Sequence, residues 1–153
     1  MKRLACVIPI SLAIVIAGCA VGETRAQSNA MAPAQVGIVN HTGNFIYSAS
    51  IDGAGGGGMD SWGAESANMC CASIPDVWHP GMKVIVRWDM PEGHKHIVKE
   101  KIVEVERYDQ PGSIYLNFFP NDEVRVVVSR VGPRNPAYPI RHAGNPNETP
   151  SSN

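Results

Sequence analysis

Cys19 is the residue whose type and position point most directly to a chemical reaction. The chain opens with Lys2 and Arg3, continues with an apolar run over residues 4–17, and then reaches a glycine and Cys19. A basic start, a short apolar core and small residues before the cleavage site are typical of a secretory leader. A cysteine directly after such residues matches the bacterial lipobox. We therefore predict that residues 1–18 are a lipoprotein signal peptide and that Cys19 is lipidated.

Lipidation of Cys19 would hold the folded part of the chain on a membrane surface. Each buried methylene contributes about 0.8 kcal/mol, and one acyl chain alone anchors only marginally. Several chains, such as palmitate, therefore anchor durably. Residue 20 is Ala rather than the Asp that retains such lipoproteins at the inner membrane, which favours the outer membrane, facing the periplasm. The alternative is an ordinary leader or signal anchor in which Cys19 is incidental; the apolar run is shorter than the about 20 residues of a membrane-spanning helix.

Cys70 and Cys71 are the cysteines that remain when Cys6 leaves with the leader and Cys19 carries lipid. In an oxidising periplasm, such consecutive cysteines form a vicinal disulfide at a cost in backbone strain. Otherwise they stay as two buried thiols whose side chains lie on opposite faces of a strand. We favour the buried thiols. No C-x-x-C motif is present, so the sequence does not predict a redox role.

A run of glycines at residues 53–58 is the second unusual feature. A phosphate-binding loop needs Lys and Ser or Thr after its glycines, followed by a helix. Here Met-Asp-Ser-Trp-Gly follows, which excludes a nucleotide site of that type. The run is either a flexible inter-strand loop or a loop that moulds to a protein partner, because glycine lets the backbone approach another surface closely. The residues predicted to bind a partner are Gly55, Gly56, Gly57, Gly58, Asp60 and Trp62.

Two histidines in a predicted hairpin, His94 and His96, are the candidates for metal binding. Both imidazoles would face the same way on a strand. Two ligands do not complete a structural zinc site, which takes four, and His41 and His79 are remote in sequence. We expect no metal and no cofactor, although a metal or redox module that combines His94 and His96 with the cysteine pair stays open as an alternative.

Signatures of common enzymes are missing from the sequence. It contains no G-x-S-x-G, H-E-x-x-H or S-x-x-K motif, and its carboxylates are scattered. We predict no catalytic residue and no small-molecule substrate. The net charge is −1 at pH 7, and removal of Lys2 and Arg3 with the leader makes it more negative by two. That charge leaves no electrostatic footprint for nucleic acid.

Apolar residues alternate with polar ones along most of the central part of the chain, and Pro and Gly punctuate the alternation. This pattern, rich in β-branched and aromatic residues, predicts half-buried strands. The predicted strands are residues 35–40, 45–52, 69–74, 82–88, 97–108, 113–118 and 124–129. The segment 97–108 also suits a helix, but its β-branched content favours a strand. We predict an all-β protein, an antiparallel β-sandwich of about seven short strands with immunoglobulin-like architecture; an open barrel is the alternative.

The alternation also predicts which aromatic side chains lie in the core. Phe45 and Tyr47 share the apolar face of their strand with Ile51. Trp88 ends an alternating run, which predicts a core position. Trp78 lies just before that run, and we expect it to plug one end of the sandwich, the alternative being exposure.

The segments that flank the predicted strands lack apolar periodicity. Residues 19–34 are small and polar, which predicts a flexible tether, and its last fifteen residues reach at most roughly 50 Å. Residues 35–140 form the predicted sandwich domain. Residues 141–153 have no apolar anchor, and we expect them to be disordered.

One block of residues resembles a known family. The block runs Cys-Cys-Ala-Ser-Ile-Pro at residues 70–75, Trp-His-Pro-Gly at 78–81 and Lys-Val-Ile-Val-Arg-Trp at 83–88. Together with weaker flanks, it resembles the DUF3304 family over residues 35–139, approximately. This resemblance implies a small proteobacterial protein, often with a lipobox leader. It also implies similarity to immunity proteins encoded beside type VI secretion phospholipase effectors of the DUF2235 type. The family offers no catalytic residues to transfer.

These observations together predict a function in binding rather than in catalysis. An acylated, tethered β domain suits a stoichiometric binder at the membrane that a lipase attacks. We expect a periplasmic lipoprotein that binds and neutralises a cognate phospholipase effector. The alternative is a structural or assembly lipoprotein of the cell envelope.

Overall fold

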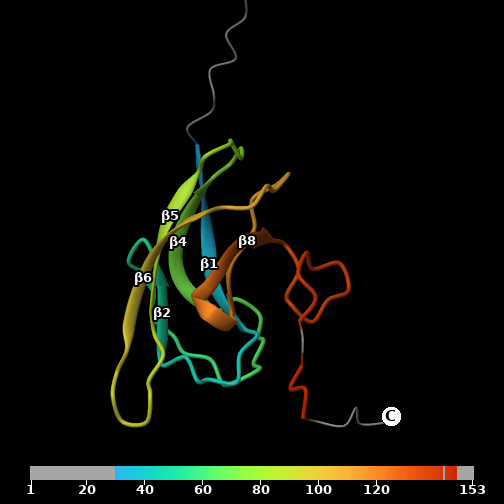
Figure 1. Cartoon of the computed structure of the whole chain (residues 1–153). Helices are drawn as coiled ribbons and strands as arrows, with labels where there is room; N and C mark the ends of the chain where they lie inside the picture. The colour runs from blue at the N-terminus through green and yellow to red at the C-terminus, as the bar shows by residue number, and fades with distance from the viewer. Residues whose placement is uncertain (1–29, 143, 148–153) are drawn as a thin grey trace, which may run out of the picture.

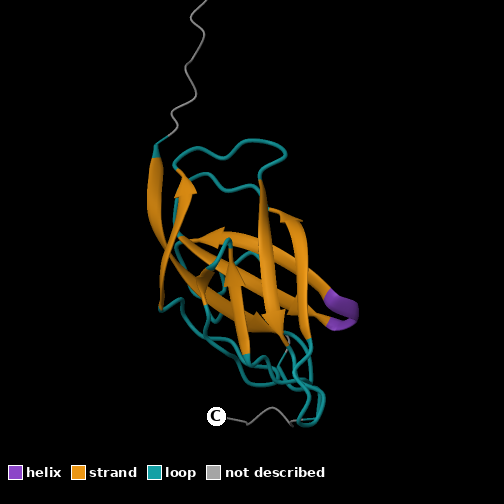
Figure 2. Ribbon diagram, turned by 90° about the vertical axis from the view of Figure 1, so that its left-hand side faces the viewer, coloured by secondary structure: helices purple, strands orange, loops and turns teal. Residues whose placement is uncertain are grey.

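Two four-stranded β-sheets pack face to face in the computed structural model, which describes residues 30–142 and 144–147 (Figures 1 and 2). The strands are β1 (Met31–Asn40), β2 (Ser48–Ile51), β3 (Ala54–Gly55), β4 (Met69–Pro75), β5 (Lys83–Asp89), β6 (Val98–Glu104), β7 (Ser113–Phe119) and β8 (Glu123–Ser129). A 3₁₀ turn, η1 (Pro120–Asp122), joins β7 to β8. Within the described residues, no helix has the length and apolar character needed to span a bilayer.

The strand order is β4-β1-β7-β8 in one sheet and β3-β2-β5-β6 in the other. Most neighbours run antiparallel, but β1 and β7 pair in parallel, so the first sheet is mixed. The predicted all-β sandwich is confirmed, and each predicted strand overlaps an observed one. The additional strand, β3, lies within the glycine run. The segment 97–108 forms a strand, β6, rather than a helix.

The core lies between the sheets and consists of the inward side chains of both. The fully buried members include Val36, Ile38, Val86, Leu116, Phe118 and Val126. The prediction for Trp88 is confirmed, because its side chain is buried in this core with its ring centroid 5.6 Å from that of Phe118. Trp78 is partly buried against the same core, and its indole N–H donates a hydrogen bond of 3.0 Å to the carbonyl oxygen of Val105.

The chain after β8 covers the outer face of the first sheet. Tyr138 and Ile140 pack there against Val39, Tyr115 and Val127. The central strands of this sheet are therefore buried on both faces. The same segment also buries Val127 of the edge strand β8, although the period-two alternation places this residue on the side away from the core.

The first strand begins earlier than the sequence pattern suggests. We predicted residues 31–34 as part of the tether, but they belong to β1 and pair with β4, with Ala32 opposite Ile74. Pro33 escapes the usual exclusion of proline from strands, because β1 pairs with β7 only from Val36 onward. The prediction was wrong because small residues and a proline conceal this first part of β1, which pairs with β4 only.

The apolar face predicted for residues 45–52 is also partly wrong. Phe45 and Tyr47 are 45% and 57% exposed, whereas Ile46 is fully buried. The chain bends at residue 47, where β2 has not yet begun, and this bend shifts the alternation by one position.

Several predicted features lie outside the described residues. These are the signal peptide, Cys19, the greater part of the tether, and residues 143 and 148–153 of the predicted tail. Within the tail, His142 contacts the body of the protein: its Nε2 lies 3.4 Å from the carbonyl oxygen of Asn40. Contacts with the sandwich therefore continue beyond residue 140, where we predicted that the domain ends.

The glycine run is a paired segment and not the flexible inter-strand loop that we considered. The Gly56 N–H donates to the Ala49 carbonyl at 2.8 Å, and the Ala49 N–H donates to the Gly57 carbonyl at 2.9 Å. Ile46 and Met59 then exchange two backbone hydrogen bonds of 2.9 Å. The run therefore prolongs the hairpin of β2 and β3 along one edge of the second sheet.

Gly58 is required by this close pairing. A Cβ atom at residue 58 would lie 2.6 Å from the carbonyl oxygen of Ile46 and 2.7 Å from that of Tyr47. Real Cβ atoms do not approach backbone oxygens so closely, so a side chain would push the two segments apart.

We expect Gly58→Ala to lower the free energy of unfolding by about 2 kcal/mol, because the overlap breaks neighbouring backbone hydrogen bonds. Denaturant unfolding measures the change. The control is Gly144→Ala, where an added Cβ meets no atom within 4 Å. Equal stability of the two variants would contradict the close pairing.

Candidate functional site

A cleft of about 390 Å³ lies where four connecting segments converge, and we call it the loop-end cleft. The segments are the turn after β1 (residues 42–44), the loop around Trp62, the chain that follows β5 (residues 90–92) and η1. Their residues in the cleft wall include Gly43, Trp62, Pro91, Lys99, Asn121 and Asp122. The turn after β1 lies at the end of the sandwich opposite to the start of that strand, as Figure 1 shows.

Backbone strain is concentrated at the loop-end cleft. Trp62, Asn121 and Asp122 have φ angles of 55°, 63° and 57°, and all three line the cleft. Among the described non-glycine residues, only Asp52 also has a positive φ, at 48°. A left-handed conformation costs a bulky residue such as Trp62 about 1–2 kcal/mol, whereas Asn and Asp adopt it more readily. Strain of this kind persists where surrounding contacts enforce it, and it clusters at binding and catalytic sites.

A buried asparagine holds two of the cleft loops together. The Nδ2 group of Asn40 donates to the carbonyl oxygens of Asn44 at 2.7 Å and Asp60 at 2.9 Å. Its Oδ1 accepts hydrogen bonds from the backbone N–H and the hydroxyl of Thr42, at 3.0 and 2.8 Å. The Trp62 N–H in turn donates to the Thr42 carbonyl at 2.9 Å. The turn after β1 and the loop around Trp62 are therefore preorganised relative to each other.

A second polar network supports the cleft from behind. His41 is buried, stacks on Phe119 with ring centroids 4.3 Å apart, and has its Nε2 3.2 Å from Asn117 Oδ1. The Asn117 Nδ2 donates to the Tyr138 hydroxyl at 2.9 Å. Burial lowers the pKa of His41 below its usual 6.5; the Asn117 hydrogen bond opposes this, and His142 reinforces it. The folded state therefore favours a neutral imidazole at residue 41.

Charged groups line one side of the cleft. Lys99 Nζ lies 2.6 and 2.8 Å from the two carboxylate oxygens of Asp122. Both side chains are partly exposed, so the pair contributes little to stability. The pair places a cation and an anion side by side in the same cleft as the aromatic rings of Trp62 and Phe119.

The predicted partner-binding residues fall in two places. Trp62 lines the loop-end cleft, and Asp60 lies beside it with an exposed side chain and a backbone carbonyl that accepts hydrogen bonds. The glycines at 55–58 lie along the β2 edge instead and do not line the cleft. Whether any of these residues contacts a partner stays a prediction.

The two histidines of the predicted hairpin, His94 and His96, have different surroundings. His94 lies in the two-residue turn between Glu92 and Lys95, whereas His96 bonds to Asp89 and packs edge-on against Tyr47. Nowhere in residues 30–142 and 144–147 do three His, Cys, Asp or Glu side chains gather as a metal site requires.

The structure joins Cys70 and Cys71 in a vicinal disulfide, which was the less favoured of the two predicted states. Both residues are exposed, so the expectation of two buried thiols was wrong. The reason is their position: they lie on β4, which forms the edge of its sheet and has no neighbouring strand on one side.

A second surface could also meet a macromolecule. The outer face of the sheet that contains β5 and β6 exposes apolar side chains, with Ile85 opposite Ile102 in the strand register. Ile102 is 67% exposed and Ile85 is 45% exposed. Exposed apolar clusters of this kind often mark interaction sites, but this face has no cleft with strained residues like that at the loop end.

Sequence reasoning missed most of the cleft. Asn121 and Asp122 follow a proline, and we interpreted this segment only as a turn. Asn117 was missed because it lies 76 positions from its partner His41. An asparagine at the centre of an apolar strand was the available clue, because a buried amide requires a polar partner.

A family model described as "Protein of unknown function (DUF3304)" matches residues 39–126. The match includes Asn40, Trp62 and Asp122 and thus every cleft loop described above. No curated protein and no solved structure matches the chain.

The lowered pKa of His41 predicts a loss of stability in mild acid. Because the folded state disfavours the charged imidazole, the unfolded state binds more protons below pH 6.5. The free energy of unfolding should therefore fall as the pH falls from 6.5, by at most about 1.4 kcal/mol per pH unit.

Denaturant unfolding between pH 7.5 and 5.5 measures this loss. His41→Gln should flatten the pH dependence, while His94→Gln, which changes the exposed hairpin turn, should behave as the unaltered chain does. An equally steep profile for His41→Gln would contradict the assignment.

Proposed function

We propose that this chain, which belongs to the DUF3304 family, is a periplasm-facing lipoprotein of the outer membrane that captures a protein partner with its loop-end cleft. The partner is a type VI secretion phospholipase effector, which the bound lipoprotein neutralises. The leader and Cys19 support the anchoring, and the resemblance to immunity proteins supports the class of partner. The absence of enzyme motifs from the sequence supports binding rather than turnover.

The single observation that carries this proposal is the preorganised, strained cleft. Three left-handed residues, Trp62, Asn121 and Asp122, are held at one site by a network anchored on the buried Asn40. Loops that are fixed before binding lose little conformational entropy when a partner docks. A rigid scaffold with such loops at one end is the arrangement that many β-sandwich binding proteins use.

The position of the cleft suits a tethered binder. The strand β1 starts at Met31, twelve positions after Cys19, and it runs the length of the sandwich to Asn40 beside the cleft. A chain anchored through Cys19 thus carries the cleft at the end away from its attachment point. That orientation leaves the cleft open to a toxin that arrives in the periplasm.

The residues of the cleft have the composition of a binding hot spot. Trp62 and Phe119 offer apolar area, and the Lys99–Asp122 pair offers a polar edge that can be satisfied by a partner. A tryptophan at the centre of such a site often contributes 2 kcal/mol or more to association. The proposed interaction therefore depends on the indole ring of Trp62.

Trp62→Asn should weaken binding of the effector at least tenfold and abolish protection. Asparagine tolerates the left-handed conformation that residue 62 adopts, so the backbone stays in place while the indole is lost. The measurements are the dissociation constant and the survival of cells that produce the lipase in the periplasm.

Ile102→Ser is the matched control, since it removes an exposed apolar side chain from the other candidate surface. It should leave protection intact. If Ile102→Ser abolishes protection and Trp62→Asn does not, the interface lies on the outer sheet face and the cleft assignment is wrong. Equal killing with and without the unaltered chain would refute the immunity function itself.

Cys19→Ser should remove the protein from the membrane fraction, because the serine cannot carry the thioether-linked lipid. Fractionation followed by immunoblotting measures the distribution, with Cys70→Ser and Cys71→Ser together as the control that keeps the anchor. Recovery of the Cys19→Ser chain with the membranes would contradict the proposed anchoring.

A further inference from the structure

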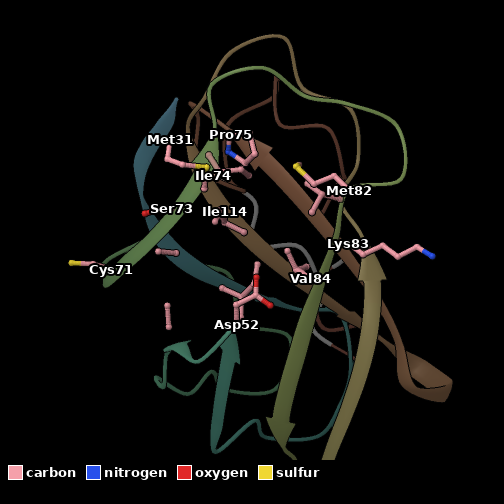
Figure 3. A pocket seen from close by; sticks show the side chains of 14 residues that line it. Met31, Asp52, Cys71, Ser73, Ile74, Pro75, Met82, Lys83, Val84 and Ile114 are labelled. Atoms are coloured by element: carbon pink, nitrogen blue, oxygen red, sulfur yellow. The ribbon is translucent and has the colours of Figure 1, made fainter. Parts of the chain in front are cut away.

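A cavity of about 420 Å³ lies between the two sheets near the start of β1 (Figure 3). Its walls come from both sheets, with β4 and β7 on one side and β2, β3 and β5 on the other. Ile51, Ile74, Val105 and Ile114 line it, and each is at most 3% exposed, so the cavity reaches the core. The cavity opens to solvent and its wall is mostly apolar, so it suits a ligand with an apolar body and a polar end at the opening. Its volume lies within the range of about 300–1,000 Å³ of small-molecule sites.

The mouth of the cavity combines flexible apolar side chains with few polar groups. The exposed Met31 lies there, and the buried Met82 lines the wall (Figure 3); methionine adapts its shape to different ligands. Asp52 also faces the cavity, but its Oδ1 already accepts a hydrogen bond of 2.8 Å from the Ile85 N–H. The mouth therefore has an apolar character with one carboxylate that is engaged by the backbone.

Lys83 is the cation at this mouth. Within the part of the chain that the structure describes, no ion pair or side-chain hydrogen bond engages its ammonium group. The side chain extends outward from the rim in Figure 3. Rotation about its four-carbon stem can bring the ammonium group over the opening, where it would complement an anionic headgroup.

The location of the mouth indicates where a ligand would come from. Met31, at the rim, lies twelve positions after Cys19, and twelve residues span at most about 40 Å. On the anchoring proposed above, the opening stays within that distance of the bilayer. The membrane is a source of single acyl chains, and a phospholipase releases more of them.

We propose that this cavity binds a long-chain fatty acid, with the acyl chain between the sheets and the carboxylate beside Lys83. The apolar floor takes the chain, the two methionines close around it, and the lysine pairs with the charge. A lipid with two chains needs more apolar volume than a single chain does. The source of the ligand rests on the proposed anchoring, but binding itself depends only on the sandwich.

The test uses the chain from Ala20 onward, which keeps every residue that the structure describes. Both core clusters lie between Ala34 and Ile140, so the omitted residues contribute nothing to them. Titration with the fluorescent fatty acid cis-parinaric acid should saturate at one ligand per chain. Palmitate should displace the probe at least tenfold better than hexadecanol, which has the same chain length and no charge.

Two variants separate the apolar chain from the headgroup. Ala72→Leu places a larger side chain in the cavity and should weaken palmitate binding at least tenfold. Lys83→Gln, a surface change, should weaken palmitate about tenfold and leave hexadecanol unchanged. Ala137→Leu, at an exposed position away from the cavity, is the matched control and should bind as the unaltered chain does.

Each other outcome overturns part or all of the proposal. The absence of saturable binding by the unaltered chain, or unchanged binding by a folded Ala72→Leu variant, removes the cavity as a site. Equal displacement by palmitate and hexadecanol, or stronger displacement by palmitoyl lysophosphatidylcholine, overturns the assignment of the carboxylate to Lys83. Because this chain lacks Cys19, failure here leaves the membrane-fractionation and toxin-protection results unaffected.

Discussion

The pairing of β1 with both β4 and β7 is the constraint on which the rest of the structure depends. Through it, one ten-residue strand lies at the centre of its sheet and connects the two ends of the sandwich. Its first residue, Met31, lies at the rim of the inter-sheet cavity, and its last, Asn40, fixes the loops of the cleft. A change in the register of β1 would therefore move both proposed sites together.

The two proposed sites lie at opposite ends of β1 and have opposite physical characters, because different residues line them. The cavity is a gap between the sheets that is lined by core residues, and it suits an apolar chain. The loop-end cleft is made of strained turns, aromatic rings and an ion pair, and it suits the varied surface of a protein. On the proposed anchoring, the apolar site is close to the membrane and the polar one faces the periplasm.

Much of the sandwich was predictable from the sequence, whereas little of the cleft was. Alternation of apolar residues located seven strands, because a half-buried strand exposes one face to water. It failed at residues 31–34, where alanines and a proline hide the pattern, and at Tyr47, where a bend shifts it. For the cleft, only Trp62 and Asp60 were identified. The network through Asn117 was missed, because its partners are far apart in the chain.

The sequence by itself determined the strand-forming segments and the turns between them, because each depends on neighbouring residues only; the leader with its cysteine stays a prediction from the same kind of local pattern. Tertiary structure alone decided that β1 and β7 run in parallel, that the glycine run pairs with β2, and that the chain after β8 covers the outer sheet face. It also decided which loops form the cleft. These features depend on contacts between distant segments, and such contacts are selected by the packing of the whole core rather than by any local pattern.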